Sequence, residues 1–360
     1  MRLLNIQDLD ALSLGSVFLA TGGGGDPWVS LMLAKQAINQ HGPVRLASVD
    51  DLNEGDRIVA VGGVGAPTVS LELLPSLDDP AKAIKAYENL LKVEVDAVIS
   101  FEIGGGNSLV PILAAAALDI PIVDGDGMGR ALPEAQMMTF AIADIPPTPA
   151  LALDYLGRIE LFRNIAIGDY EPIIRRWAHE HGGMITTVEH PMVKKDLSKA
   201  MVPGSLSFAI EVGKAILRNE GKLQSLLLEL ENLFEDSIYG RLVHLFTGKI
   251  NAFERRIEGG YDLGRVSIHT LEPGHQSCAE LLIKNEFIQV SIDEQVIATV
   301  PDLIVALDLE SAQPLNAERL AYGQRIVLLG IGAPPHYRTQ RALDVVGPSC
   351  FGLAATYSPI

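Results

Sequence analysis

The sequence predicts an α/β protein with two domains, and three observations lead to that expectation. Runs of apolar, β-branched residues alternate with helical patterns between residues 7 and 123. A proline-rich segment at 145–149 interrupts this alternation, and short β-like runs dominate between 242 and 330. Strands that alternate with helices are typical of a mostly parallel, Rossmann-like sheet with helices on both faces. The later runs indicate a β-rich C-terminal domain with a helical insertion.

The first domain is expected to span residues 1–165. Asp26 suits the N-cap position and Pro27 the first helical position, so these two residues should begin a helix. Asp79-Pro80 opens another helix in the same way. The predicted helices cover 7–19, 28–40, 79–91 and 107–118, and the predicted strands cover 57–61, 96–101 and 120–123.

The second domain is expected to span residues 166–360, because a chain of 360 residues exceeds the size at which one hydrophobic core usually divides. Its first part, 170–235, is predicted to be largely helical, with an interruption at Pro203-Gly204. Its second part is predicted to form a compact β-rich unit. The β-like runs lie at 249–250, 265–268, 280–283, 287–290, 303–307 and 325–329.

The composition excludes several classes of partner. A net charge of −17 argues against binding to a phosphate backbone, which requires clustered Lys and Arg, so no nucleic-acid partner is expected. The N-terminus lacks the apolar core of a signal peptide, and no run of about 18 apolar residues predicts a membrane span. The expected location is therefore the cytoplasm, without a membrane partner. The two cysteines have no metal-type spacing.

Four glycine-dense segments occur in the first third of the chain, at 20–27, 62–67, 101–108 and 124–129. Glycine permits close approaches that a side chain would forbid, so such turns on one side of a sheet would expose a floor of backbone N–H groups. No nucleotide-binding fingerprint accompanies them. The first segment could instead be a helix-to-helix turn packed against the sheet. The predicted substrate-binding residues are Thr21, Gly23, Gly24, Gly25, Gly63, Gly105, Asn107 and Glu134.

Acidic side chains accompany the glycine segments. Glu102 follows a predicted strand, where open parallel sheets bind ligands, and a partly buried carboxylate there can act as a general base. It could instead cap the next helix or pair with Arg130. Asp124 and Asp126 could offer two carboxylates to a divalent metal ion or a substrate amine, or stabilise a turn by Asx hydrogen bonds.

His190 precedes a proline and could reach the site from the second domain. An isolated histidine is more often structural or solvated than a ligand. The predicted catalytic residues are Glu102, Asp124, Asp126 and His190, and the predicted metal ligands are Asp124 and Asp126.

In combination, these motifs resemble those of the S-methyl thiohydantoin desulfurase-like family, over nearly the whole chain. The motifs are ATGGGGDP at 20–27, EIGGGN at 102–107, DGDGMGRALPE at 124–134, NE at 285–286, VPDLI at 300–304, YG at 322–323, VGP at 346–348 and FG at 351–352. The resemblance implies attack of water on a five-membered thiohydantoin or hydantoin-like ring. It also implies an association with hydantoinase/oxoprolinase-type enzymes.

We therefore expect a hydrolase that acts on a small cyclic amide or thioamide in a cleft between the two domains. Carboxylates or a divalent metal ion would activate the water. The alternative is a non-catalytic metabolite-binding protein or a subunit of a hydantoinase-type assembly. Self-association is a further possibility. A pure binding protein has less need of several convergent carboxylates, so the acidic residues favour the hydrolase.

Overall fold

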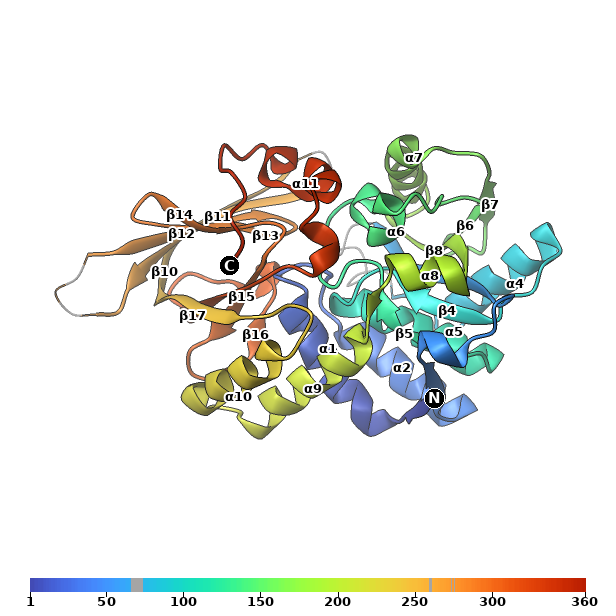
Figure 1. Ribbon diagram of the computed structural model, residues 1–360, viewed down its shortest axis with the longest axis horizontal. Helices are drawn as coiled ribbons and strands as arrows, with labels where there is room; N and C mark the ends of the chain where they lie inside the picture. The colour runs from blue at the N-terminus through green and yellow to red at the C-terminus, as the bar shows by residue number, and fades with distance from the viewer. Residues whose placement is uncertain (66–73, 259–260, 273, 275) are drawn as a thin grey trace.

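The computed structural model describes residues 1–65, 74–258, 261–272, 274 and 276–360, and it contains two β-sheets packed against helices (Figure 1). The first sheet follows the order β1-β2-β5-β4-β3-β8-β6-β7, with β9 beside β5. Its strands are β1 (Arg2–Leu4), β2 (Val44–Ala47), β3 (Arg57–Gly65), β4 (Ala97–Ser100), β5 (Ile122–Asp126), β6 (Ala150–Leu153), β7 (Ile159–Phe162), β8 (Met184–Val193) and β9 (Val202–Pro203).

The centre of the first sheet is parallel and its margins are antiparallel. Strands β2, β5, β4 and β3 run in parallel, whereas β1, β8, β6, β7 and β9 pair in antiparallel fashion. The predicted α/β class is confirmed. The helices of this half are α1 (Ile6–Leu19), α2 (Trp28–His41), α4 (Asp79–Leu91), α5 (Val110–Leu118), α6 (Thr139–Ile142), α7 (Ile167–Glu180), α8 (Lys194–Ala200), α9 (Ser205–Arg218) and α10 (Leu223–Glu235).

Helices cover both faces of the first sheet, as predicted. Successive strand residues point to opposite faces. Along β3, Val59 and Val61 join a core formed with α1, α2, α4, α5 and α9, whereas Ile58 and Ala60 join a core formed with α6, α7 and α8. Burial on both faces explains why this strand reads as a continuous apolar run.

The second sheet is entirely antiparallel, in the order β14-β13-β12-β11-β10-β17-β15-β16, which confirms the β-rich C-terminal unit. A short helix, α11 (Gln340–Val346), follows it. The strands are β10 (Leu242–Glu258), β11 (Tyr261–Thr270), β12 (Cys278–Lys284), β13 (Glu286–Ile292), β14 (Gln295–Thr299), β15 (Leu303–Asp308), β16 (Pro314–Leu315) and β17 (Arg325–Ile331).

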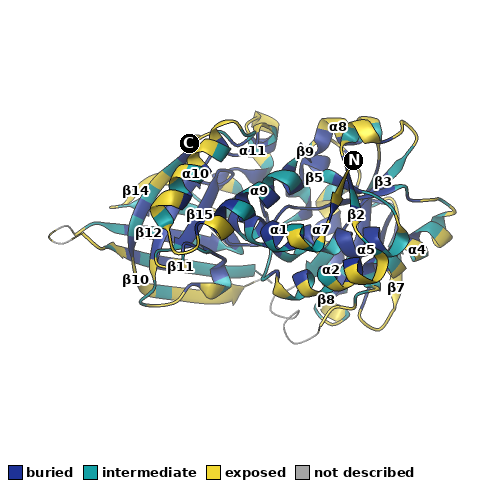
Figure 2. Ribbon diagram, turned by 90° about the horizontal axis from the view of Figure 1, so that it is seen from below, coloured by how far each residue is buried: buried dark blue, intermediate teal, exposed yellow. Residues whose placement is uncertain are grey.

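As a group, helices α1, α9 and α10 connect the two sheets, because α9 contacts β5 whereas α1 contacts β15 and α10 contacts β10. Buried residues of these helices share one hydrophobic core with residues of the first sheet and with residues of β15 and β17. The dark inner faces of α1 and α9 in Figure 2 lie toward the interior of the molecule. At the crossing of α1 and α9, a Cβ at Gly213 would lie 1.7 Å from the Ala11 carbonyl oxygen, and one at Gly15 would lie 1.8 Å from the Ala209 carbonyl oxygen. The two helices therefore approach each other at a distance that only glycine permits.

The segment 170–235 is largely helical, as predicted, but it also contains two strands that the sequence did not predict. Strand β8 pairs with β3 and β6, and β9 pairs with β5. The run Ile185-Thr186-Thr187-Val188 is β-branched, which favours a strand. The chain therefore returns to the first sheet after residue 165.

Two of the four glycine segments differ from the predicted turns. Gly62 to Gly65 continue strand β3, because they pair with Met184 to Thr187 of β8. Asp124 to Asp126 likewise complete strand β5. The remainder of the second segment, Ala66 and Pro67, lies outside the described residues.

Candidate functional site

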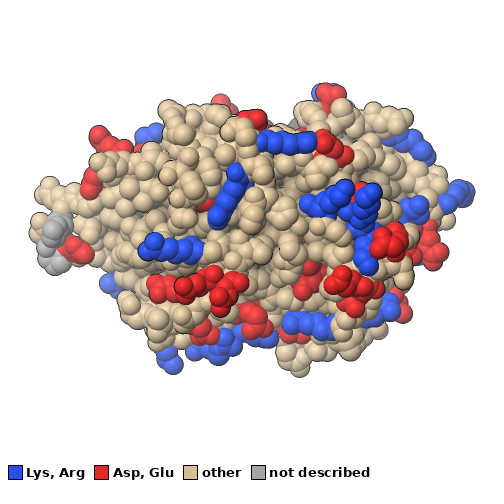
Figure 3. Space-filling view, in the orientation of Figure 1, with Lys and Arg blue, Asp and Glu red and all other residues tan. Residues whose placement is uncertain are grey.

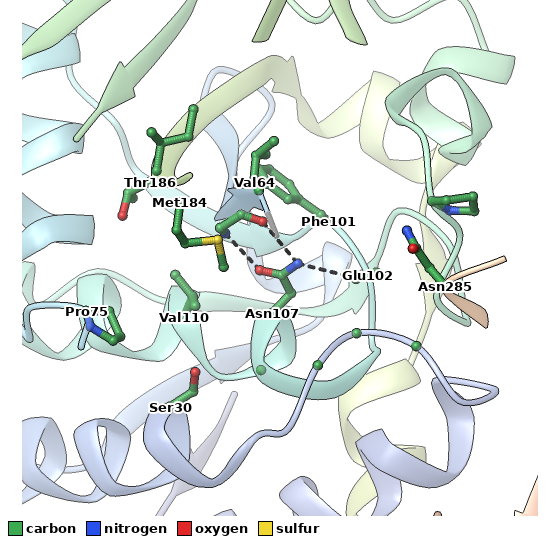
Figure 4. A pocket seen from close by; sticks show the side chains of 18 of the residues that line it. Ser30, Val64, Pro75, Phe101, Glu102, Asn107, Val110, Met184, Thr186 and Asn285 are labelled. Carbon is green, nitrogen blue, oxygen red and sulfur yellow. Dashed lines mark hydrogen bonds between the residues drawn. The ribbon is translucent and has the colours of Figure 1, made fainter. Parts of the chain in front are cut away.

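A cavity of about 280 Å³ lies between the two sheets. Its walls come from the glycine segments, the loops after β4 and β5, helix α7, strand β8 and the second sheet. Figure 4 shows Asn107 inside this cavity, with Ser30 and Val110 on one side and Met184 and Thr186 on the other. The position follows from the topology, since β3, β4 and β5 are parallel and their carboxyl ends meet at one edge of the sheet.

Glu102 lies on the wall of the cavity directly after β4 and is 8% exposed. The side-chain N–H of Asn107 donates to Oε1 of Glu102 at 2.8 Å, and Oδ1 of Asn107 accepts from the Gly63 N–H at 2.8 Å (Figure 4). Burial raises the pKa of Glu102 to about 8, although the Asn107 hydrogen bond opposes the rise. Three predicted site residues therefore meet here: Glu102, Asn107 and Gly63.

Glu286 is a second buried carboxyl group on the cavity wall, and the sequence did not predict a role for it. It begins β13, is 4% exposed, and its Oε2 has no hydrogen-bond partner among the described residues. Burial and the nearby charge of Glu102 raise the pKa of Glu286 well above its ordinary value, while Arg130 opposes the rise. The available signal was the Asn285-Glu286 motif, which directly precedes the predicted strand 287–290.

Two glycine segments interlock beside these carboxyl groups. The Gly106 N–H donates to the Gly24 carbonyl at 3.0 Å. A Cβ at Gly105, whose φ is +48°, would lie 2.1 Å from that carbonyl oxygen, and one at Gly23 would lie 2.3 Å from Oε1 of Glu286. Gly23, Gly24 and Gly25 line the cavity, whereas Gly105 supports them from behind.

Asp126 is fully buried and does not line the cavity. Its Oδ2 accepts backbone N–H groups from Ile103 at 2.8 Å, Met128 at 3.0 Å and Gly129 at 2.7 Å. Burial raises the pKa of Asp126 to about 6, against the effect of these backbone hydrogen bonds. The carboxyl group thus joins the loops that follow β4 and β5.

Asp124 also lies away from the cavity wall. Its Oδ1 accepts the Ser207 N–H at 3.0 Å and its Oδ2 accepts the Ser207 hydroxyl at 2.6 Å, in the first turn of α9. Both oxygens of Asp124 and one oxygen of Asp126 accept hydrogen bonds, and the metal-ligand role of this pair stays a prediction. Within the described ranges, no three His, Cys, Asp or Glu side chains are grouped so that they could hold a metal ion.

Arg130 connects the glycine segments to the second sheet. Its Nη1 donates to the carbonyls of Pro301 at 2.7 Å and Asp302 at 2.9 Å, and its Nη2 donates to the Thr21 hydroxyl at 2.7 Å. Both Arg130 and Thr21 are fully buried. Thr21, predicted to bind substrate, does not line the cavity and instead holds this guanidinium.

His190 and Glu134 occupy different surroundings. His190 is fully buried in a bulge of β8, in the first sheet, with its Nδ1 3.3 Å from Oε1 of Glu189. Glu189 lines the cavity but His190 does not, so the prediction that His190 reaches the site from the second domain is not met. Glu134 lines the cavity and pairs with Lys284 of the second sheet at 3.2 Å.

Comparison with known families identifies the chain. Family models for the S-Me-THD-like N-terminal domain and the S-Me-THD-like C-terminal domain match residues 7–164 and 166–360. The chain belongs to the S-Me-THD-like family. The resemblance inferred from the glycine and acidic motifs is thereby confirmed.

The fold of this S-Me-THD-like chain also occurs in an X-ray crystal structure of a protein from Chromobacterium violaceum. The similarity covers 100% of both chains, with a TM-score of 0.85 and 22% sequence identity. At this identity the likeness concerns the fold alone. No protein with a curated description matches the chain.

The surface of the S-Me-THD-like chain carries charges of both signs. Acidic and basic side chains are interspersed on the face in Figure 3. Across the residues that the structure describes, every helix is too short or too polar to cross a bilayer. The cytoplasmic location stays a prediction.

Proposed function

We propose that the chain is a hydrolase that acts on a small five-membered cyclic amide or thioamide of the thiohydantoin or hydantoin type. The family assignment supports a desulfurase or hydantoin-related role. The observation that carries the proposal is the Glu102 carboxyl group, which is buried on the cavity wall with its pKa raised to about 8. A carboxyl group with a pKa near the working pH can both accept and return a proton.

Asn107 and the glycine segments position the reacting groups. Asn107 accepts from Gly63 and donates to Glu102, so its side chain fixes the direction of the carboxyl group. Gly24 and Gly25 line the cavity, and their N–H groups form no hydrogen bond with another described residue. Such groups are suitable donors to a ring carbonyl whose negative charge increases as water attacks.

The reaction with an S-methylated thiohydantoin is balanced by one molecule of water. The water oxygen bonds to the ring carbon that carries the sulfur, and Glu102 accepts one proton. The carbon–sulfur bond then breaks, and Glu102 returns that proton to the leaving methanethiolate. The second water proton moves to the ring nitrogen, so the products are a hydantoin and methanethiol.

Replacement of Glu102 tests this assignment. Glu102→Gln preserves the size of the side chain but removes the proton acceptor, so the rate of methanethiol release should fall by about a hundredfold or more. A thiol reagent measures release, and chromatography measures the hydantoin. Glu160→Gln is the matched control, because Glu160 is exposed on β7 and does not line the cavity.

Two outcomes would contradict the assignment. If Glu102→Gln releases thiol at the wild-type rate, Glu102 is not the base. If hydantoins bind but the wild-type protein releases no thiol, the chain is a metabolite-binding protein instead. Association with a hydantoinase-type protein and self-association stay predictions.

A further inference from the structure

The charges around the cavity favour one class of substituent on the five-membered ring of the proposed substrate. Arg175 and Arg255 are the only basic side chains that line the cavity within the described part of the chain, and both are engaged by carboxylates. Arg175 pairs with Glu171, and Arg255 donates to Asp262 at 2.7 Å. A negatively charged ligand would therefore find no unpaired cation on these walls.

Two carboxyl groups on the cavity wall each have one oxygen that accepts no hydrogen bond from a described residue. Oε2 of Glu286 and Oε2 of Glu318 are buried without a hydrogen-bond partner among the described residues. The groups lie close enough for the charge of Glu318 to act on Glu286. They belong to β13 and to the short turn Ala317–Arg319, both in the second domain.

The arrangement is costly as long as no donor reaches these two oxygens; the charge of Arg255 acts on Glu318, but Arg255 already donates to Asp262. A buried acceptor without a donor destabilises the folded protein, and two neighbouring carboxyl groups repel each other when both are ionised. Arg130 is the buried cation on the Glu286 side, but its N–H groups already donate to the Thr21 hydroxyl and to carbonyl groups. A nitrogen cation from a ligand would supply both the missing donors and the missing charge.

We propose that Glu286 and Glu318 form a subsite for a positively charged nitrogen group on the substrate, such as an ammonium or a guanidinium. This inference rests on the proposed function, because it places the five-membered ring beside Glu102 and the charged substituent beside Glu286 and Glu318. The substrate is then a ring with a basic side chain. A ring with a carboxylate side chain would meet like charges and be rejected.

Three hydantoins that differ only in their side chain test the subsite: one with an aminobutyl, one with a pentyl and one with a carboxypropyl chain. Titration calorimetry measures each dissociation constant. The aminobutyl ring should bind about tenfold more tightly than the pentyl ring, and the carboxypropyl ring more weakly than either. Equal or tighter binding of the carboxypropyl ring would overturn the proposal.

Two variants test whether Glu318 causes the preference for a positively charged side chain. Glu318→Gln keeps the side-chain shape but removes its charge, so the aminobutyl-to-pentyl ratio should fall to about threefold or less. Glu310→Gln removes a carboxylate that pairs with Arg325 on the surface and does not line the cavity, so it should keep the wild-type ratio. An unchanged ratio in Glu318→Gln would overturn the assignment.

Ring-free probes and turnover separate this proposal from the proposed function. In the wild-type protein, butylammonium should raise the thermal unfolding midpoint and butyrate should not; the reverse order would contradict the subsite even if Glu318→Gln fails to fold. If the predicted charge order of binding appears without thiol release, the hydrolase proposal fails and the subsite stands. If S-methylated forms of all three rings react with equal kcat/KM, the subsite fails and the hydrolase proposal stands.

Discussion

At the scale of single residues, burial determines the character of the two carboxyl groups in the cavity. Glu102 and Glu286 are both nearly inaccessible to water, and burial is the largest cause of the raised pKa of each. Their surroundings differ, because Asn107 donates to Glu102 whereas Oε2 of Glu286 has no described donor. In our proposals Glu102 accepts the proton, because Asn107 stabilises its ionised form, and Glu286 meets a positively charged ligand group that supplies its missing donor.

Gly105 provides a residue-scale prediction. Its φ of +48° disfavours any other residue, and an alanine Cβ would lie 2.1 Å from the Gly24 carbonyl oxygen. Gly105→Ala should destabilise the protein by about 2 kcal/mol or more and displace the two interlocked glycine segments. Thermal unfolding and hydantoin binding measure the two effects.

Gly55→Ala is the matched control for Gly105→Ala. No atom lies within 4 Å of a Cβ at Gly55, and its φ is outside the left-handed region. Its stability should change by no more than about 0.5 kcal/mol. Equal unfolding midpoints for the two alanine variants would contradict the interlocking of the glycine segments.

The sequence predicted the site residues that directly follow a strand, but not those that distant segments bring to the cavity. Glu102 and Asn107 follow a strand pattern, so local periodicity indicates their position at a strand end. Glu286 reaches the cavity only because the second sheet packs beside the first, which no local pattern encodes. Thr21 was predicted to bind substrate because of its glycine neighbours, yet its hydroxyl accepts from Arg130, 109 residues away in the chain.

At the scale of elements, three parallel strands bring the site together. The end of β3 contributes Gly63, the loop after β4 contributes Glu102, and the loop after β5 contributes Glu134. The positions of these strands were predicted from apolar runs. Their lengths were not, because the pairing of Gly62 to Gly65 with β8 extends β3 through residues that resemble a turn in sequence. Glycine signals a turn locally, but a neighbouring strand can hold it in a ladder.

Asp124 provides an element-scale prediction. Its two oxygens accept from Ser207 in the first turn of α9, where the helix dipole favours a negative charge. Asp124→Asn should lower stability by about 1 kcal/mol, because it removes that charge, and should leave kcat/KM within about twofold of wild type. Thermal unfolding and thiol release measure the two quantities. If Asp124→Asn loses turnover while its stability is unchanged, Asp124 takes part in the reaction and this prediction is wrong.

At the scale of the whole molecule, the cavity depends on how the two sheets are joined. Helices α1, α9 and α10 form a core with both sheets on one side. Nearer the cavity, Arg130 donates across to the carbonyls of Pro301 and Asp302. Glu134, in the loop after β5, forms a further ion pair with Lys284 of the second sheet. The sequence predicted two domains and a cleft, whereas these contacts between distant segments required the structure.

Arg130 provides a prediction at this scale. Arg130→Met leaves the buried carbonyls of Pro301 and Asp302 and the Thr21 hydroxyl without their donor, so stability should fall by about 3–5 kcal/mol. Arg341→Met is the control, because Arg341 pairs with Asp144 on the surface, and its effect should stay below about 1 kcal/mol. Thermal unfolding midpoints compare the two. Similar midpoints would show that Arg130 does not join the domains.

The dependence of kcat/KM on pH, measured by methanethiol release between pH 6 and 9, tests the central claim most directly. Glu102 must be ionised to accept a proton from water, and its pKa is raised to about 8. The account therefore predicts that kcat/KM rises about tenfold per pH unit until pH approaches 8, and that Glu102→Gln loses this rise. A wild-type profile that is flat or falling from pH 6 to 8 would contradict the account.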